Sequence, residues 1–184
     1  MPTLLLAVFL LQSGDKDPGP KSSLDAGIVY LLLDPALGAE EKMVPGVEAA
    51  FQMSMSEPRY TIGLRAYYRQ WDVKFEEFNQ LPADLDGEAR QLGLNLVVTY
   101  PFTPALSLAV ELGGGGFLLE HDEDEETAFF FEGAAYLRLD LLGGLFVQAG
   151  GGAFGALTEF GGQEDDSDHV SWIARITLGL QFDF

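Results

Sequence analysis

Ionisable residues of both signs recur within otherwise apolar stretches of the sequence. Pairs such as Arg65 and Arg69, or Arg138 and Asp140, are spaced so that a β-strand would place both members on one face. An unpaired charge held away from water costs several kcal/mol, so such groups are expected to bind one another. The set that we expect to form this polar network is Glu48, Arg65, Arg69, Glu111, Glu132, Arg138, Asp140 and Arg175.

Two other segments are strongly acidic and could bind metal ions. Residues 120–126 read Glu-His-Asp-Glu-Asp-Glu-Glu, and residues 164–168 read Glu-Asp-Asp-Ser-Asp. Carboxylates are preferred ligands of Ca²⁺ and Mg²⁺, but the first run lacks the central glycine and the ligand spacing of an EF-hand loop. A solvated, self-repelling loop is the simpler interpretation. We therefore expect no cofactor and no specific metal site, with weak divalent-cation binding at most, at Glu120, Asp122, Asp124 and Glu126.

The overall composition narrows the class of protein. The 184 residues include 10 Lys and Arg against 29 Asp and Glu, a net charge of −19, yet 47% of them are hydrophobic. This charge excludes a nucleic-acid binder that relies on a basic face. The absence of cysteine excludes disulfides, cysteine-ligated zinc and thiol catalysis. No apolar run reaches the roughly 18 residues of a membrane-spanning helix. A chain both apolar and anionic must keep these properties in separate places.

The N-terminal segment, residues 1–13, is interpreted as a signal peptide. Thr3–Leu11 is a short apolar core followed by small residues, although no Lys or Arg precedes it. A buried strand is the alternative interpretation. Residues 14–23 are polar and rich in proline and glycine, which indicates a flexible spacer. The remaining chain, 24–184, is then a single domain.

Eight runs of alternating residues fill this domain. Apolar residues alternate with small or polar ones at period 2, and each run has about the length that a tilted strand needs to cross a bilayer. No helical period competes with this pattern. The sequence therefore predicts an all-β fold, an eight-stranded antiparallel up-and-down barrel. The apolar faces of the eight runs begin at Leu24, Val47, Tyr60, Leu92, Leu106, Phe129, Leu145 and Trp172.

The alternation alone does not say which face points outward. A soluble lipocalin-like carrier turns its apolar face inward, whereas a transmembrane barrel turns it toward lipid. The polar faces contain no lysine and many Gly and Ala residues, which suit a narrow lumen better than a water-exposed surface. We therefore predict a transmembrane barrel whose lumen is plugged by polar and charged side chains, with a gated proton or small-ion path as the alternative. Aromatic residues on the apolar faces fit an interfacial girdle: Tyr60, Tyr68, Tyr100 and Trp172.

The connections between the runs differ in length in a regular way. Short turns and long loops alternate, which is typical of outer-membrane barrels with periplasmic turns. An even number of strands would place both termini on the periplasmic side. Most acidic residues lie in the long loops, so the negative charge is expected at the extracellular rim. The turns are residues 56–59, 101–104 and 142–144, and the loops are residues 34–46, 72–88, 120–126 and 159–169.

This pattern and the last run together resemble a known class. The alternation, the loop asymmetry and the final segment Trp172–Phe184 are similar to the small outer-membrane barrels of the OmpA/OmpX-like class, without a periplasmic peptidoglycan-binding domain after the barrel. In that class a terminal aromatic residue is the recognition signal for the barrel-assembly machinery. The resemblance implies that this machinery is a partner and that the signal here is Leu178, Leu180, Phe182 and Phe184.

One group of residues could carry nucleophilic catalysis. His169 and Ser171, with Asp183 further on, resemble the His-x-Ser arrangement of outer-membrane lipid A deacylases. Asp183 would lie at the opposite end of the same strand from Ser171, with about 30 Å of membrane between them. A triad needs hydrogen-bond contact, so a histidine in a loop at head-group level is favoured. No catalytic residue is therefore expected.

The function predicted from the sequence is that of an outer-membrane β-barrel with a structural or surface-interaction role and acidic extracellular loops. A lipid-modifying hydrolase and a soluble lipocalin-like carrier are the alternatives. The expected partners are outer-membrane lipid, the assembly machinery, divalent cations and an unknown extracellular ligand at the loops, with no nucleic acid.

Overall fold

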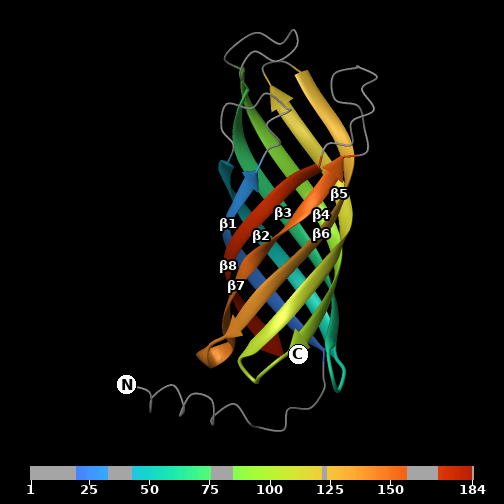
Figure 1. The fold of residues 1–184 in the computed structure, drawn as a ribbon, viewed down its shortest axis with the longest axis vertical. Coiled ribbons are helices and arrows are strands. Elements are labelled where there is room, and N and C mark those ends of the chain that lie inside the picture. The colour runs from blue at the N-terminus through green and yellow to red at the C-terminus, as the bar shows by residue number, and fades with distance from the viewer. Residues whose placement is uncertain (1–19, 33–42, 76–84, 122–123, 157–169, 184) are drawn as a thin grey trace.

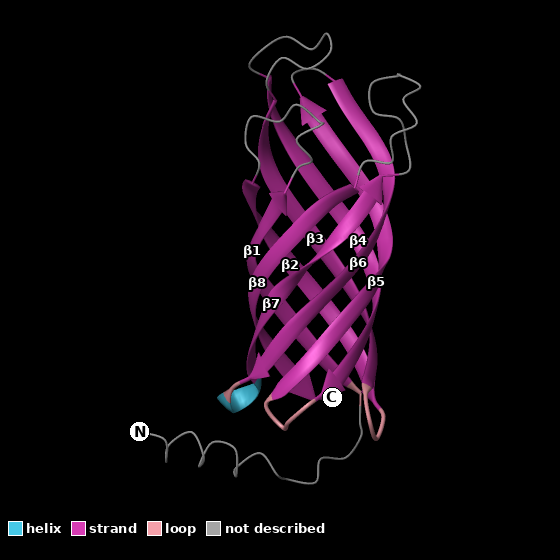
Figure 2. Cartoon of the chain, in the orientation of Figure 1, coloured by secondary structure: helices cyan, strands magenta, loops and turns pink. Residues whose placement is uncertain are grey.

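The computed structural model describes residues 20–32, 43–75, 85–121, 124–156 and 170–183. The expected signal peptide and most of the spacer therefore lie outside the described residues. Within them the chain forms eight strands and one short 3-10 helix (Figures 1 and 2). These elements are β1 (Lys21–Leu32), β2 (Met43–Ser56), β3 (Thr61–Phe75), β4 (Leu85–Pro101), β5 (Leu106–His121), β6 (Asp124–Asp140), η2 (Leu142–Gly144), β7 (Leu145–Ala156) and β8 (Val170–Asp183).

The strands form a closed barrel in which each one pairs antiparallel with its neighbours in sequence. The β1–β8 pair closes the ring, so that Leu24 lies opposite both Phe51 of β2 and Leu180 of β8. A closed sheet has no open edge to pair with another chain. The prediction of an eight-stranded antiparallel up-and-down barrel is confirmed. Strand β1 begins at Lys21, before the Leu24 from which the alternation was counted. Among the described residues, no helix has the length and hydropathy to cross a membrane.

Three tight turns join strands at the end of the barrel where the chain enters β1. The β2–β3 turn is closed by the Glu57 amide, which donates to the Tyr60 carbonyl at 2.8 Å. The β4–β5 turn is closed by the Phe102 amide, which donates to the Leu106 carbonyl at 2.8 Å. The β6–β7 turn contains Gly143 with a φ of 72°, a left-handed conformation that favours glycine. These are the positions at which short turns are expected, and the other four connections start from the opposite strand ends.

Two of the long connections differ from the sequence-based expectation. The expected loop 72–88 is shorter than the sequence predicts, because β3 runs to Phe75 and β4 begins at Leu85. Most of the expected loop 120–126 is strand, since β5 runs to His121 and β6 begins at Asp124.

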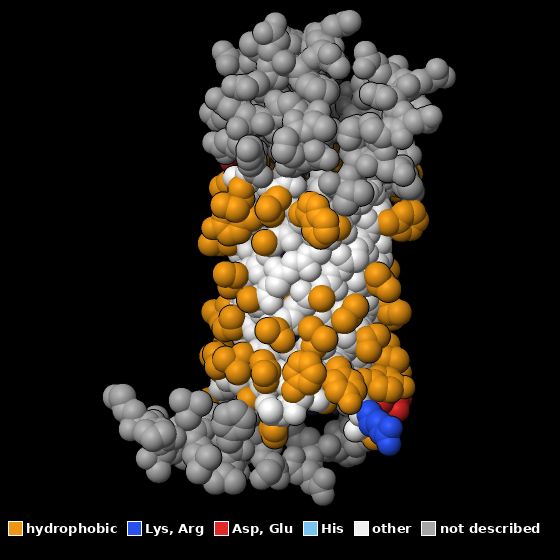
Figure 3. All heavy atoms as spheres, in the orientation of Figure 1, with side chains coloured by type: hydrophobic (Ala, Val, Ile, Leu, Met, Phe, Trp, Pro, Cys, Tyr) orange, Lys and Arg blue, Asp and Glu red, His pale blue; other side chains and the backbone are white. Residues whose placement is uncertain are grey.

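The apolar faces of the strands point outward. Leu92 is 66% exposed and Phe129 is 70% exposed, although residues of this type are normally buried in a water-soluble protein. Figure 3 shows hydrophobic side chains distributed over the outer surface of the wall between its two ends. An exterior of this kind requires a hydrocarbon solvent, so the wall spans a membrane. It also rules out the alternative of a lipocalin-like carrier, which needs these side chains inside.

A charge on this wall should weaken the barrel. We expect Leu94→Arg to lower the free energy of unfolding by about 2–4 kcal/mol, because an arginine near the bilayer midplane loses its hydration. Leu94 is 55% exposed on the outer surface of β4. Urea titration in phospholipid vesicles measures the loss. A matched substitution at the solvent end of the wall, Tyr100→Arg, should cost about 1 kcal/mol or less. Equal losses for both variants would show that the wall does not face lipid.

Candidate functional site in the barrel lumen

The inward faces of the strands fill the lumen with charged and polar groups. Each of the eight strands contributes a side chain to one central cluster, named here the central network. Its guanidinium and carboxylate groups are almost fully buried, with Arg65 and Arg69 at 0% exposure. The network consists of Asp25, Glu48, Arg65, Tyr67, Arg69, Gln91, Asn95, Glu111, Glu132, Gln148 and Arg175.

Glu48 of β2 lies at the centre of the network and accepts from three arginines. The Arg65 Nη2 group donates to Oε1 at 2.7 Å, and the Arg175 Nη1 group donates to the same oxygen at 3.1 Å. The Arg69 Nε group donates to Oε2. One carboxylate thus joins β2 to β3 and, across β1, to β8. Removal of Glu48 would leave three guanidinium groups short of an acceptor.

Arg69 of β3 connects this centre to the opposite wall. Its two terminal nitrogens bind both oxygens of Glu132 on β6, with Nη2 donating to Oε1 at 2.9 Å. The Tyr67 hydroxyl donates to Glu132 Oε2 at 2.9 Å. A two-point contact between guanidinium and carboxylate is the strongest and most directional of the common ion pairs. Strands β3 and β6 are therefore held together through the lumen as well as through the sheet.

The remaining acids complete the network. The Arg175 Nη2 group donates to Glu111 Oε1 at 2.7 Å, and Asn95 Nδ2 donates to the other oxygen of Glu111 at 3.2 Å. The Arg65 Nη2 group also donates to Asp25 Oδ1 at 2.6 Å. Every carboxylate of the network therefore has a guanidinium partner, as the desolvation cost of a buried charge requires.

Two of the eight residues expected in the network lie elsewhere. Arg138 Nε donates to Asp140 Oδ1 at 2.7 Å, and Arg138 Nη2 donates to Gln181. The Arg138 guanidinium carbon lies 3.8 Å from the centre of the Phe146 ring. This group is a separate pair at the short-turn rim, where the Asp140 side chain is 35% exposed. Six residues of the expected set therefore belong to the central network, and the other two form a rim pair.

Sequence reasoning missed several members of the central network. Asp25 is not in the expected set, although its place between the outward-facing residues Leu24 and Ala26 puts it on the inward face. Two tyrosines on the polar faces also stack on arginines. The Arg175 guanidinium carbon lies 3.4 Å from the centre of the Tyr136 ring, and that of Arg69 lies 4.1 Å from the centre of the Tyr67 ring. These contacts supply a cation–π interaction that residue spacing does not reveal.

Glycines make room for these rings. A Cβ atom at Gly93 would lie 2.4 Å from the Tyr67 ring, and one at Gly150 would lie 2.8 Å from the Tyr136 ring. Each ring therefore lies over the bare backbone of a glycine on a neighbouring strand. From the sequence, these glycines are expected only to leave room in a narrow lumen. In the structure they also determine where the two tyrosines stack.

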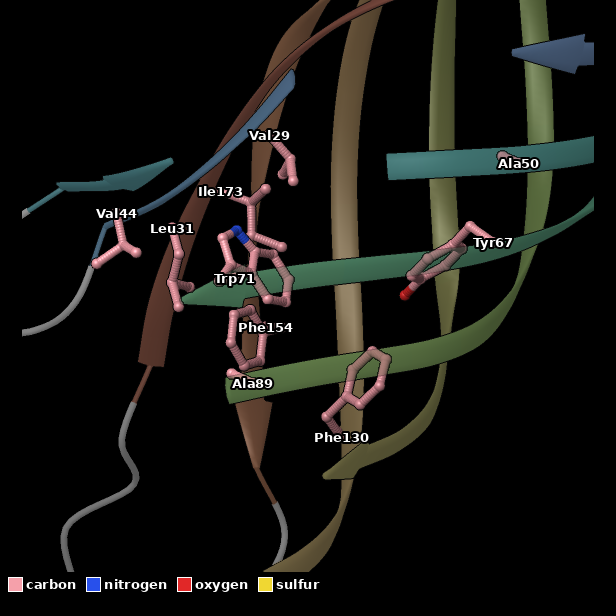
Figure 4. Packing of buried hydrophobic residues seen from close by; sticks show 10 residues of the cluster. All are labelled: Val29, Leu31, Val44, Ala50, Tyr67, Trp71, Ala89, Phe130, Phe154 and Ile173. Atoms are coloured by element: carbon pink, nitrogen blue, oxygen red, sulfur yellow. The ribbon is translucent and has the colours of Figure 1, made fainter. Parts of the chain in front are cut away.

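An apolar layer lies in the lumen beyond the central network, in addition to the polar and charged side chains expected there. Its larger side chains are Trp71, Phe130 and Phe154, which converge from β3, β6 and β7 (Figure 4). The Phe130 and Phe154 ring centres are 5.9 Å apart in an edge-on arrangement. The layer lies toward the strand ends that carry the long connections. Its other members are Val29, Leu31, Val44, Ala89 and Ile173, with Phe117 packed against them.

The residues considered for catalysis and metal binding are not brought together. Ser171 is 6% exposed and points into the lumen, on the same face of β8 as Ile173 and Arg175. Asp183 lies at the other end of that strand, and His169 lies outside the described residues. Among the described side chains, no three acidic or histidine groups gather to hold a metal ion. Glu120 instead accepts from Arg90 at 2.9 Å, and the side chains of Asp122, Asp124 and Glu126 are not described.

The barrel resembles solved membrane proteins in its fold. It aligns with Ail of Yersinia pestis, solved in complex with the heparin analogue sucrose octasulfate, at a TM-score of 0.59 and 14% identity, covering 89% of this chain and 99% of that chain. Neisserial surface protein A aligns at a TM-score of 0.53 and 9% identity, covering 90% and 97%. The fold is that of a small outer-membrane β-barrel. The sequence matches no protein-family model and no curated protein.

The expected girdle residues, and two of the four residues of the expected assembly signal, lie on the outer wall of this outer-membrane barrel. Tyr60 and Tyr100 lie at the short-turn end, whereas Trp172 lies near the opposite end of the wall, and all three are exposed. Tyr68 is also exposed and donates to Gln70. In the final strand, Leu178 and Leu180 point outward, Phe182 is half-buried, and Phe184 lies outside the described residues.

Proposed function

We propose that this protein is a closed, non-catalytic outer-membrane barrel with a structural or surface-interaction role. The observation that carries the proposal is the filled lumen, in which a layer of ion pairs and a layer of aromatic side chains lie one above the other. An eight-stranded barrel is just wide enough for side chains to fill its interior. Polar groups that are engaged with one another have little capacity to conduct solute.

The contact surface of such a protein would be its acidic connections. The segments that join β1 to β2, β3 to β4, β5 to β6 and β7 to β8, together with the strand ends beside them, carry 20 of the 29 acidic residues of the chain, within residues 34–46, 72–88, 120–126 and 159–169. They leave the barrel at one end, opposite the three tight turns. A dense anionic rim attracts cationic partners. It also attracts divalent cations, which can bridge its carboxylates to anionic lipid head groups. One protein of similar fold is named Neisserial surface protein A, and Ail is named the attachment invasion locus protein, which supports a role of this kind.

The absence of catalysis is part of the proposal. Ser171, the one serine considered as a nucleophile, points into the lumen rather than toward the lipid whose acyl chains a deacylase would cut. Its expected carboxylate partner lies at the far end of the strand.

Conductance tests the closed lumen. Purified barrel inserted into planar lipid bilayers is expected to give no sustained current, because the ion pairs and the aromatic layer leave no continuous water column. A large, stable, unselective conductance would contradict the proposal. The control is the double variant Trp71→Ala with Phe130→Ala. A current through this variant would show that the assay detects opening of the apolar layer.

Protease access tests the proposed location and orientation. We place the protein in the outer membrane of a Gram-negative-type bacterium, with both termini in the periplasm and the long connections outside. Protease added to intact cells is expected to cut the segments between β1 and β2 and between β7 and β8. The short turns should be cut only after the outer membrane is permeabilised. The reverse pattern would overturn the orientation and leave the closed lumen untouched.

A further inference from the structure

The outer wall contains a groove where β5 and β6 meet. Its volume is about 690 Å³, and its lining is almost entirely apolar. The floor is the bare backbone of Gly113, Gly114 and Gly115, with Phe129 and Phe131 along one side. Gly116 continues the floor, and a Cβ atom placed on it would meet nothing within 4 Å.

Two ridges of large side chains run along the groove. On one side, Leu92 and Leu94 of β4 lie opposite Gly116 and Gly114. On the other side, Phe129 and Phe131 of β6 lie opposite the same two glycines. All four ridge residues are at least half exposed on the lipid side of the wall. The space between them follows β5, and Leu112 of the same strand lines it beyond Gly114.

A polar cluster ends the groove on the side of the long connections. Arg90 of β4 points outward at the next position beyond Leu92 and donates to Glu120 of β5 at 2.9 Å and to Glu88. These side chains are about one-third exposed. They mark the level at which the hydrocarbon gives way to head groups, so the groove lies just inside the adjacent leaflet. In the orientation proposed above, on which this inference rests, that leaflet is the outer one.

We propose that this groove holds one saturated acyl chain of lipid A. Below the level of the polar cluster, the groove faces only lipid acyl chains. In the outer leaflet of an outer membrane, these acyl chains belong to lipid A. Association inside a bilayer gains little from the hydrophobic effect, because lipid is as apolar as the protein wall, so selection depends on van der Waals fit. A straight, saturated chain lies along a straight groove with contacts on three sides. A kinked, unsaturated phospholipid chain loses part of those contacts.

The head group contributes little to this site. Glu88 and Glu120 already accept from two of the three nitrogens of Arg90, and their charges oppose a phosphate. The shape of the groove is therefore expected to set the preference. Arg90→Gln should change lipid binding much less than a residue that fills the groove.

Photolabelling tests the site directly. Full-length barrel in vesicles is exposed to lipid A or to an unsaturated phospholipid, each carrying a photoreactive acyl chain, and the adducts are mapped by mass spectrometry. The lipid A probe is expected to label Phe129 and Phe131 at least about threefold more than Ile28 and Ile176 on the far wall, because only the groove holds a chain by shape. The phospholipid probe should label the whole wall evenly.

A matched pair of variants gives the control. Gly116→Leu adds a side chain at a position where a Cβ atom meets nothing within 4 Å, so it should occupy the groove and reduce lipid A labelling to the level of the far wall. Ala135→Leu adds the same side chain to exposed wall outside the groove and should leave labelling unchanged. Retention of a heat-modifiable band on gels verifies that both variants fold. Even labelling by lipid A, unchanged labelling of Gly116→Leu, or preference for the phospholipid would each overturn the proposal. Conductance and protease access do not depend on this outcome, so failure here is distinguishable from failure of the proposed function.

Discussion

Replacement of Arg69 by methionine is expected to lower the free energy of unfolding by about 3–5 kcal/mol, because it leaves the buried Glu132 without its guanidinium partner and takes one of three from Glu48. Arg69 binds both Glu48 and Glu132 while fully buried. The variant also takes away the cation that lies over the Tyr67 ring. Urea titration of barrel folded in vesicles, followed by tryptophan fluorescence and by gel mobility, measures the loss.

The matched control is Arg138→Met at the rim. Its partner Asp140 remains one-third exposed and can regain water, so the expected loss is about 1 kcal/mol or less. A double variant separates the cost of an orphaned charge from the value of the pair. Arg69→Met combined with Glu132→Leu removes both partners and should recover part of the loss. If Arg69→Met and Arg138→Met were equally mild, the central network would not be buried as described.

Replacement of Trp71 by alanine is expected to cost about 3–5 kcal/mol, the range for removal of a large buried aromatic side chain. Trp71 is 1% exposed at the centre of the apolar layer. Its ring packs over Gly46, where a Cβ atom would lie 2.3 Å from a ring carbon. The cavity left by alanine is enclosed by neighbouring strands, which cannot collapse into it without breaking sheet hydrogen bonds.

The control for this position is Trp71→Phe. Phenylalanine keeps most of the apolar contact and removes an indole nitrogen that has no hydrogen-bond partner among the described residues. The expected loss is about 1 kcal/mol or less. Thermal unfolding of both variants in vesicles measures the difference. A loss for Trp71→Phe as large as that for Trp71→Ala would mean that the indole nitrogen, rather than packing, holds the layer together.

The architecture of the barrel could be predicted from the sequence because period-2 alternation assigns each residue to a face. Leu92, Leu94 and Leu96 point outward and Gln91 and Asn95 point inward, as that period requires. The turn positions followed from proline and glycine chemistry in the same way. These features depend on neighbours along the chain, which the sequence displays directly.

The arrangement inside the lumen depends on contacts across the ring and could not be predicted in the same way. Arg175 binds Glu48 although β1 lies between their strands, and this pairing follows from the stagger of the whole barrel. Alternation also fails where both faces are apolar. The run from Ile28 to Leu32 gives no sign that Val29 and Leu31 belong to an apolar layer inside. The apolar layer and the ion pairs lie at different heights along the barrel. A two-residue period assigns each residue to a face but says nothing about its height.

The contact between Arg175 and Glu48 joins residues 127 positions apart in the chain. It cannot form until the first and last strands have met, since neither side chain reaches the other across an open sheet. A sheet that entered the bilayer before closing would bring Glu48, Glu111 and Arg65 against acyl chains without their full set of partners. Insertion and ring closure should therefore occur as one cooperative step, with partly inserted intermediates too costly to accumulate.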